Sequence, residues 1–321
     1  MKKGLIPLRK MKKTYLVTGA AGFIGSALAQ KIIDLGHGVV SIDNLSTGKA
    51  SNIPKGVVFI KGDCQSVDIV NTLKNFRFDA IFHMAGQSSG EISFEDPVYD
   101  LQTNTQSTLL LLKLCSEIGC SNFIYASTMS VYGDHADLPV SEKDSCIPKS
   151  FYAVGKLASE NYLKLYSEKN LKTTALRFFN VYGPGQNLTN MKQGMVSIFL
   201  SMALKNKQIH VKGDPDRFRD FIYIDDLVDA VWSSVTRKGL NFEVINLCSG
   251  TKTKVKEVIE NICNNISDNI EVDYIGGTPG DQFGIYGSAE YAGKIMDWKS
   301  KVNFQDGMKA MISWAKTELN E

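Results

Sequence analysis

Short apolar runs alternate with stretches of helical periodicity along the first 180 residues of the chain. The stretches at 26–35 and around 101–115 have the apolar spacing of helices packed on a core. Alternation of this kind predicts an α/β fold, in which a doubly wound parallel sheet has helices on both faces. The apolar runs have the length of buried strands and lie at 14–18, 39–42, 57–60, 80–83 and 123–126.

The pattern becomes irregular after Gly183-Pro184-Gly185, where glycine and proline are more frequent. We therefore expect a first domain over residues 12–180 and a smaller C-terminal α/β lobe over 181–321, with some segments returning to the first domain. The first 13 residues hold six Lys or Arg but no apolar segment of a signal peptide. Because Met11 could be an alternative start, residues 1–11 are interpreted as an N-terminal tail.

Composition removes several classes of function. The 321 residues carry a net charge of +2, and no basic block occurs beyond residue 13, so neither nucleic acid nor an anionic membrane is an expected partner. No apolar run approaches the ~20 residues of a membrane helix. The six cysteines are scattered and form no Cys-x-x-Cys pair, so we expect no metal site and no disulfide framework. Reduced thiols fit a cytoplasmic protein.

A glycine-rich turn follows the first predicted strand, with Gly19, Gly22 and Gly25 spaced three and three residues apart. Gly19 can make the tight turn, Gly22 lets the backbone approach a pyrophosphate, and Gly25 lets the helix pack close to the strand. The helix that includes Phe23 and Ile24 would present its first N–H groups to the phosphates. The turn predicts a dinucleotide site, and the alternative is an ordinary glycine turn.

Carboxylates follow the next two predicted strands. Asp43 lies 18 residues beyond Gly25, where it could accept hydrogen bonds from an adenosine ribose. A carboxylate there repels a 2′-phosphate and no arginine occurs between residues 38 and 56, so we predict NAD as the cofactor rather than NADP. Asp63 could contact the adenine, and the neighbouring Asn44 and Cys64 are assigned to the same site. The alternative for both aspartates is turn chemistry at a strand end.

Tyr152 and Lys156 are four residues apart on a predicted helix and therefore lie on one face, one turn from each other. An ammonium at that distance favours the phenolate and lowers the pKa of the tyrosine from its usual value near ~10. This pair can supply a general base at neutral pH. Taken alone, the spacing is also that of two solvated neighbours on a helix.

In order and spacing, the motifs of this chain resemble those of the extended short-chain dehydrogenase/reductases, specifically the NAD-dependent nucleotide-sugar epimerases and dehydratases. The resemblance implies an NAD-binding Rossmann-type domain and a smaller lobe that roofs a nucleotide-sugar site. The motifs that carry it are 18–25, 43–48, 83–86, Asn104 with Thr108, 127–133, 152–156, 177–184, 219–226 and 279–281.

The resemblance also implies roles for single residues. Tyr152 and Lys156 match the catalytic pair, and Thr128 matches the catalytic Ser/Thr, with Ser127 as the alternative. Asn180 would contact the phosphates or the sugar, and Arg219 would bind the diphosphate through its fork of donors. The further cofactor residues implied are Ala85, Gly86 and Asn104, with Tyr152 and Lys156. The substrate residues implied are Ser88, Ser89, Thr128, Tyr152, Asn180, Arg219 and Asp281.

The reaction implied begins with proton abstraction from the sugar 4-hydroxyl by Tyr152 and hydride transfer from C4 to NAD⁺. A 4-epimerase returns the hydride to the other face of the 4-ketosugar and needs no further acid or base. The related 4,6-dehydratases carry an acid/base pair where this chain has Met129 and Ser130. We therefore expect a nucleoside-diphosphate-sugar epimerase that acts at C4 of a UDP-sugar.

Two departures from the family pattern leave alternatives open. Thr278 replaces an arginine that often precedes Pro279-Gly280-Asp281 and contacts phosphate. Glu91 is either a solvated loop acid or an additional proton shuttle, whereas His83 is interpreted as structural. The alternatives are decarboxylation, dehydration or C2/C5 epimerisation through a ketosugar, and NAD binding without catalysis. By family analogy we expect a homodimer that pairs the helices around 101–115 and 152–167 in a four-helix bundle.

Overall fold

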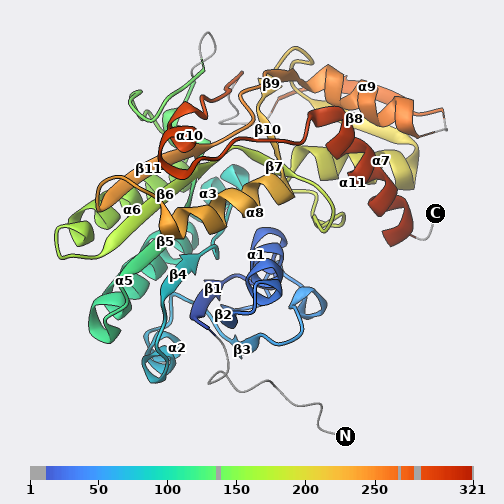
Figure 1. The fold of residues 1–321 in the computed structure, drawn as a ribbon. Coiled ribbons are helices and arrows are strands. Elements are labelled where there is room, and N and C mark those ends of the chain that lie inside the picture. Colours follow the sequence, from blue (N-terminus) through green and yellow to red (C-terminus); the bar gives the residue numbers. More distant parts are fainter. Residues whose placement is uncertain (1–11, 135–138, 267–268, 278–282, 320–321) are drawn as a thin grey trace, which may run out of the picture.

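Seven parallel strands form the central sheet, in the order β11-β6-β5-β4-β1-β2-β3 (Figure 1). The structure is a computed structural model that describes residues 12–134, 139–266, 269–277 and 283–319. The strand order reverses between β1 and β4, as in a doubly wound Rossmann-type sheet, so the predicted fold class is confirmed. The strands are β1 Thr14–Thr18, β2 Gly38–Asp43, β3 Val58–Lys61, β4 Ala80–His83, β5 Asn122–Thr128, β6 Lys172–Phe178 and β11 Phe242–Leu247.

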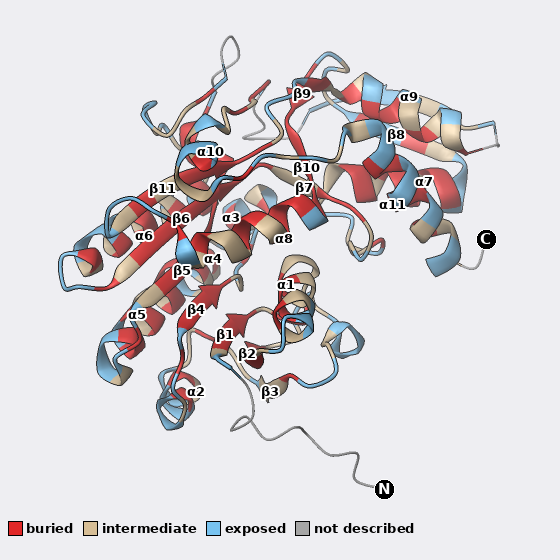
Figure 2. Ribbon diagram, viewed as in Figure 1, coloured by how far each residue is buried: buried red, intermediate tan, exposed pale blue. Residues whose placement is uncertain are grey.

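Both faces of the sheet are covered by helices. Leu16 of β1 packs in a core with α5 and α6, whereas Tyr15 and Val17 pack in a second core with α1 and α8. Alternate residues of a strand face opposite sides of the sheet, so a continuous apolar run fits a strand that is buried on both faces. Figure 2 shows β1, β4 and β6 in the colour of buried residues. The helices around the sheet are α1 Phe23–Asp34, α2 Val67–Thr72, α3 Gly90–Glu95, α4 Pro97–Leu101, α5 Ser107–Ile118, α6 Phe151–Ser167 and α8 Ile224–Ser233.

The helical run expected around residues 101–115 consists of three consecutive segments. Asp96 caps the start of α4, where its Oδ1 accepts a hydrogen bond from the Tyr99 N–H at 2.9 Å. Between α4 and α5 the chain makes one π-helical turn, η4 (Gln102–Gln106), which includes the buried Asn104. Such widened turns occur frequently at functional sites.

The C-terminal lobe, at the upper right of Figure 1, is built from three two-stranded sheets and the helices α7, α9 and α11 within the described residues. The chain crosses between the two parts more than once, because β11 completes the central sheet and α8 packs on α1, with Lys31 and Asp229 2.6 Å apart. The strand pairs are β7 Asn180–Tyr182 with β10 Phe221–Tyr223, β8 Gln208–Lys212 with β13 Glu271–Ile275, and β9 Phe218–Arg219 with β12 Thr253–Lys254. The helices of this lobe are α7 Met195–Asn206, α9 Val255–Asn265 and α11 Phe304–Glu318, whereas α10 Glu290–Met296 packs beside β11 of the central sheet. Short 3-10 turns are η2 Ala50–Asn52, η3 Leu73–Asn75, η5 Met129–Tyr132 and η6 Ser234–Thr236.

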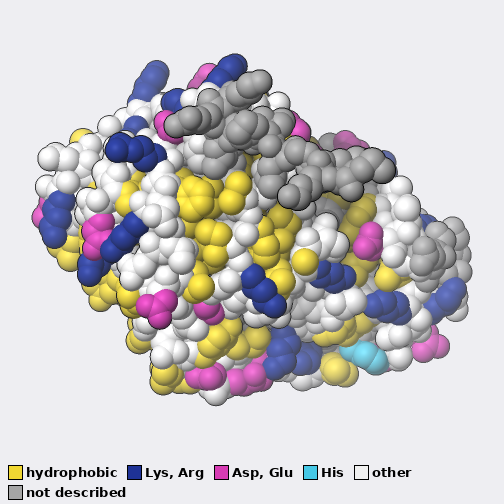
Figure 3. Space-filling model, turned by 90° about the horizontal axis from the view of Figure 1, so that it is seen from below, with side chains coloured by type: hydrophobic (Ala, Val, Ile, Leu, Met, Phe, Trp, Pro, Cys, Tyr) yellow, Lys and Arg dark blue, Asp and Glu magenta, His cyan; other side chains and the backbone are white. Residues whose placement is uncertain are grey.

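Charged side chains of both signs are interspersed with hydrophobic ones on the face shown in Figure 3. All six cysteines are free thiols. The described residues contain no group of three or more His, Cys, Asp or Glu side chains that could hold a metal ion. None of the helices described is long and apolar enough to cross a membrane.

Candidate active site

The glycine-rich turn between β1 and α1 forms one end of a cavity of about 430 Å³. Gly19 has φ +75°, and a Cβ added at Gly25 would lie 2.2 Å from the Gly19 carbonyl oxygen. The turn therefore needs glycine at both positions. Helix α1 begins after Gly22 without a side-chain cap, so its first N–H groups are free of a competing side chain. This backbone cradle fits the pyrophosphate of a dinucleotide.

The residues predicted for the adenosine side lie together along the same cavity. Asp43 ends β2, and its two carboxylate oxygens accept hydrogen bonds from the backbone N–H groups of Ala21 and Leu45 at 2.9 and 2.8 Å. The Asn44 amide donates to Asp63 Oδ2 at 2.8 Å and so ties the ends of β2 and β3 together. Cys64 is buried beside them, and burial raises the pKa of its thiol.

Thr128, Tyr152 and Lys156 come together at the other part of the cavity wall. Thr128 ends β5, while Ser150 caps α6 through the Ala153 N–H and thereby places Tyr152 and Lys156 in its first two turns. Both side chains are buried. The Lys156 ammonium donates to the Ala126 carbonyl at 2.9 Å and lies 5.8 Å from the centre of the Tyr152 ring.

The electrostatics of this pair differ from the expectation drawn from spacing alone. Burial raises the pKa of Tyr152 to about 12, the charge of Asp100 acts in the same direction, and a hydrogen bond with Thr128 opposes both. Burial also lowers the pKa of Lys156 to about 8, against the attraction of Asp100 and Glu160. Desolvation disfavours the charged form of each group. In the protein alone, burial therefore outweighs the opposing hydrogen bond with Thr128.

Two polar residues near Thr128, Tyr152 and Lys156 lie behind the cavity wall. His83 is fully buried, with Nδ1 2.8 Å from Thr18 Oγ1 and Nε2 3.2 Å from Ser107 Oγ. Burial lowers the pKa of His83 to about 3, so the ring is neutral and joins neighbouring elements, as the structural interpretation expects. Asn104 is also fully buried and does not line the cavity, although Ala85 and Gly86 do.

The residues predicted for substrate divide into three groups. Ser88, Ser89 and Asn180 line the cavity. Arg219 does not, because its side chain is buried in the C-terminal lobe and donates to the carbonyls of Phe218 and Phe283 at 2.8 and 3.3 Å. Burial and the neighbouring Arg217 lower the pKa of Arg219 to about 10. Asp281, with Thr278, lies outside the described residues. Glu91 is exposed in the first turn of α3 and does not line the cavity.

Sequence reasoning did not find the segment before α7, which completes the cavity. Lys192 and Gln193 reach across to the first domain, where Lys192 Nζ lies 2.9 Å from Glu95 and the Gln193 amide donates to Ser88 Oγ. The polar run between Gly185 and Gly194 was the sequence feature that could have indicated this loop. The cavity residues of this segment and the start of α7 are Gln186, Asn187, Asn190, Gln193, Gly194, Met195 and Val196.

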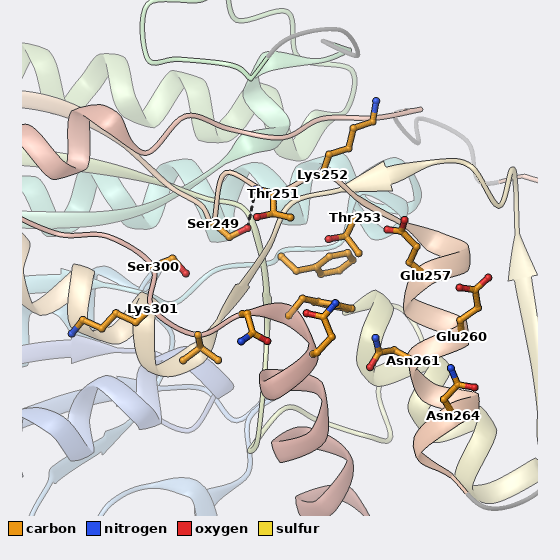
Figure 4. Close-up of a pocket in the computed structure, with 15 residues that line it drawn as sticks. Ser249, Thr251, Lys252, Thr253, Glu257, Glu260, Asn261, Asn264, Ser300 and Lys301 are labelled. Carbon is orange, nitrogen blue, oxygen red and sulfur yellow. Dashed lines mark hydrogen bonds between the residues drawn. The ribbon is translucent and has the colours of Figure 1, made fainter.

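A second cavity, of about 580 Å³, lies in the C-terminal lobe (Figure 4). Glu257, Glu260, Asn261 and Asn264 of α9 form one wall, opposite the loop that precedes α11. Phe221 lines both cavities, but none of the predicted catalytic or cofactor residues lies in the second. The first cavity is therefore the candidate active site.

A Rossmann-type sheet whose cavity joins a glycine turn to a Thr–Tyr–Lys group defines an NAD-dependent enzyme of the short-chain dehydrogenase/reductase class. The model of the NAD dependent epimerase/dehydratase family matches residues 15–248, so the chain belongs to that family and is an NAD-dependent epimerase. The predicted cofactor is thus confirmed.

Known proteins resemble the chain over nearly its whole length. The UDP-glucose 4-epimerase of Thermotoga maritima, solved with UDP-glucose, is 32% identical with a TM-score of 0.92 over 95% of this chain and 99% of that one. The UDP-glucose 4-epimerase of Thermus thermophilus, solved with NAD, is 32% identical with a TM-score of 0.88 over 94% and 98%. A UDP-glucuronate 4-epimerase of Thermodesulfobacterium geofontis is 28% identical over 95% of this chain and 97% of its own length.

Proposed function

We propose that the protein interconverts the C4 epimers of a UDP-sugar through a transient 4-ketosugar. The observation that supports this most directly is one cavity that holds the glycine turn and Asp43 with Thr128, Tyr152 and Lys156. The similar proteins named above for UDP-glucose and UDP-glucuronate agree with a UDP-sugar substrate.

In this proposal NAD supplies the hydride acceptor and donor, held by the glycine turn and Asp43. Tyr152 takes the proton of the sugar 4-hydroxyl and returns one when the ketone is reduced. The Thr128 hydroxyl hydrogen-bonds the same sugar oxygen, and the Lys156 ammonium stabilises the phenolate. Met129 and Ser130 line the cavity beside them and offer no carboxylate, so elimination of water at C5 and C6 has no acid/base pair there.

The charges of the cavity favour a neutral sugar. Among the described residues that line it, Lys156 is the only Lys or Arg, and it lies at the reacting end. A sugar carboxylate would therefore enter without a dedicated cation, at a cost in desolvation. Epimerisation of a neutral hexose is the main proposal, and epimerisation or decarboxylation of a uronate is the second.

Product analysis tests this choice. The purified protein is mixed with UDP-glucose, UDP-N-acetylglucosamine and UDP-glucuronate, and with GDP, CDP and dTDP sugars, and products are followed by NMR and mass spectrometry. We expect a product of unchanged mass with inverted C4 from a neutral UDP-sugar, formed at least ~10-fold faster than from UDP-glucuronate. Loss of carbon dioxide or water would contradict the proposal, and no conversion of any sugar would favour NAD binding without catalysis.

We further propose the homodimer that the family resemblance implies, in which the helical run around 101–115, with α4 at its start, and α6 pair with their copies. Val98 and Leu101 of α4 and Val154 of α6 are more than half exposed, at 64%, 56% and 51%. Phe94 and Phe151 extend this apolar surface, with ring centres 5.5 Å apart. Burial of such side chains contributes ~25 cal/mol per Å². Sedimentation velocity should show a dimer that Val154→Asp converts to monomer, and a monomeric unmodified protein would contradict the assignment.

A further inference from the structure

Asp100 is a buried carboxylate next to the catalytic group that the proposed reaction does not use. It lies on α4, is 1% exposed and does not line the cavity. Its Oδ1 accepts hydrogen bonds from two neutral amides, Gln87 Nε2 at 2.8 Å and Asn104 Nδ2 at 3.0 Å. An ionised carboxylate in such a place requires a compensating positive charge.

Lys156 is the cation that supplies this compensation. Burial raises the pKa of Asp100, and the hydrogen bond from Gln87 and the charge of Lys156 oppose it. The other carboxylate near Lys156 is Glu160, which is already neutralised by Arg177, with Nε–Oε1 and Nη2–Oε2 distances of 3.0 and 2.7 Å. Asp100 forms no ion pair of that kind within the described ranges, so its charge remains available to Lys156.

Asp100 also sets the orientation of Asn104. Both hydrogens of the Asn104 amide are used, one toward the Gln87 carbonyl at 2.9 Å and one toward Asp100. If the Asn104 amide were turned over, its Oδ1 would face the Asp100 carboxylate, with two acceptors and no hydrogen between them. Asp100 therefore selects the observed orientation. Asn104 Oδ1 then lies buried with no partner among the described residues.

This oxygen and the Lys156 ammonium approach the same point of the cavity wall. A Cβ added at Gly86, which lines the cavity, would lie 2.6 Å from Asn104 Oδ1 and 3.2 Å from Lys156 Nζ. Asn104 Oδ1, which Asp100 orients, and the Lys156 ammonium, whose charge Asp100 balances, therefore lie together beside the backbone of Gly86.

We propose that Asp100 is a positioning residue that keeps Lys156 protonated and fixes the Asn104 carboxamide, and thereby sets the pH range in which Tyr152 can act. The other groups that face Lys156 do not replace it. Tyr125 and His83 are buried and neutral, and Glu160, which also raises the pKa of Lys156, is held in an ion pair by Arg177. The activity readout of this proposal rests on the proposed function, whereas its titration readout does not.

Asp100→Asn separates the charge from the hydrogen bonds, because the asparagine Oδ1 can still accept from Gln87 and Asn104. Loss of the negative charge lowers the pKa of Lys156 and also that of Tyr152, since Asp100 raises both. Lys156 must be protonated and Tyr152 ionised for proton abstraction. Both limbs of the pH profile of kcat therefore move to lower pH by about one unit. Between the two limbs turnover changes little, because a larger ionised fraction of Tyr152 offsets a smaller protonated fraction of Lys156.

Two measurements test the proposal. NMR of ¹³C-labelled lysine, with the Lys156 signal identified by its loss in Lys156→Arg, should show a titration midpoint about one unit lower in Asp100→Asn. The pH profile of kcat should show the matching shift of both limbs. Asp96→Asn, which removes an exposed carboxylate at the start of the same helix, should leave both unchanged.

The outcomes remain distinguishable. An unchanged Lys156 midpoint in Asp100→Asn, or equal shifts in Asp96→Asn, would overturn the proposal. Asp100→Ser, with a smaller side chain, provides a second variant if the first does not fold, and the same lowered midpoint is expected. If the unmodified protein converts no sugar, the proposed function fails while the NMR midpoint still decides the role of Asp100.

Discussion

Tyr152→Phe is expected to lower kcat about a thousandfold while NAD binding stays within about twofold, because general acid/base groups typically contribute ~10²- to 10⁴-fold. Phenylalanine fills the same buried space, so the change removes the hydroxyl that acts on the sugar and little of the packing. Steady-state kinetics with the sugar found in the product assay and calorimetric titration with NAD measure the two effects.

Tyr162→Phe is the matched control for this prediction. Tyr162 lies on α6 like Tyr152, but it packs against the core under α5 and is not among the cavity residues. Its variant should turn over at nearly the normal rate. A Tyr152→Phe enzyme that keeps more than about a tenth of the normal kcat would show that another group moves the proton.

Arg177→Met is expected to lower the free energy of unfolding by about 3–5 kcal/mol, because it leaves Glu160 as a buried charge without its partner. The pair is nearly inaccessible, with side chains 5% and 4% exposed and a shortest distance of 2.7 Å. Glu160 also accepts from the Ser127 hydroxyl, beside Thr128 at the end of β5. Thermal unfolding should show a midpoint lower by roughly 10 °C.

An exposed pair provides the control for the buried one. Lys74 and Glu117 are 2.8 Å apart on the surface, with side chains 45% and 35% exposed. Glu117→Gln should leave the unfolding midpoint nearly unchanged, because solvent screens such pairs. The double variant Arg177→Met with Glu160→Met should recover much of the loss, since no unpaired charge remains. Equal destabilisation by Arg177→Met and Glu117→Gln would contradict the prediction.

Local patterns were sufficient for the strands and for the dinucleotide turn. The predicted strands at 14–18 and 80–83 coincide with β1 and β4, and the run at 57–60 differs from β3 by one residue. These patterns are local because a strand buried on both faces needs a short continuous apolar run. The prediction of one long helix around 101–115 was less accurate, because it missed the π turn η4. Helical periodicity in the sequence continues through such a turn, which contains one additional residue.

The remaining features depend on burial and on contacts between distant residues. From its own motifs the chain determined the alternation of strands and helices, the glycine turn at Gly19, the spacing of Tyr152 and Lys156, and NAD as cofactor. Only the tertiary structure decided that Arg219 is buried and donates to the Phe283 carbonyl, that burial raises the pKa of Tyr152, and that the charge of the buried Asp100 acts on Lys156. The reason is physical: a residue type shows what a side chain can do, but its desolvation and its partners are set by segments that folding brings together.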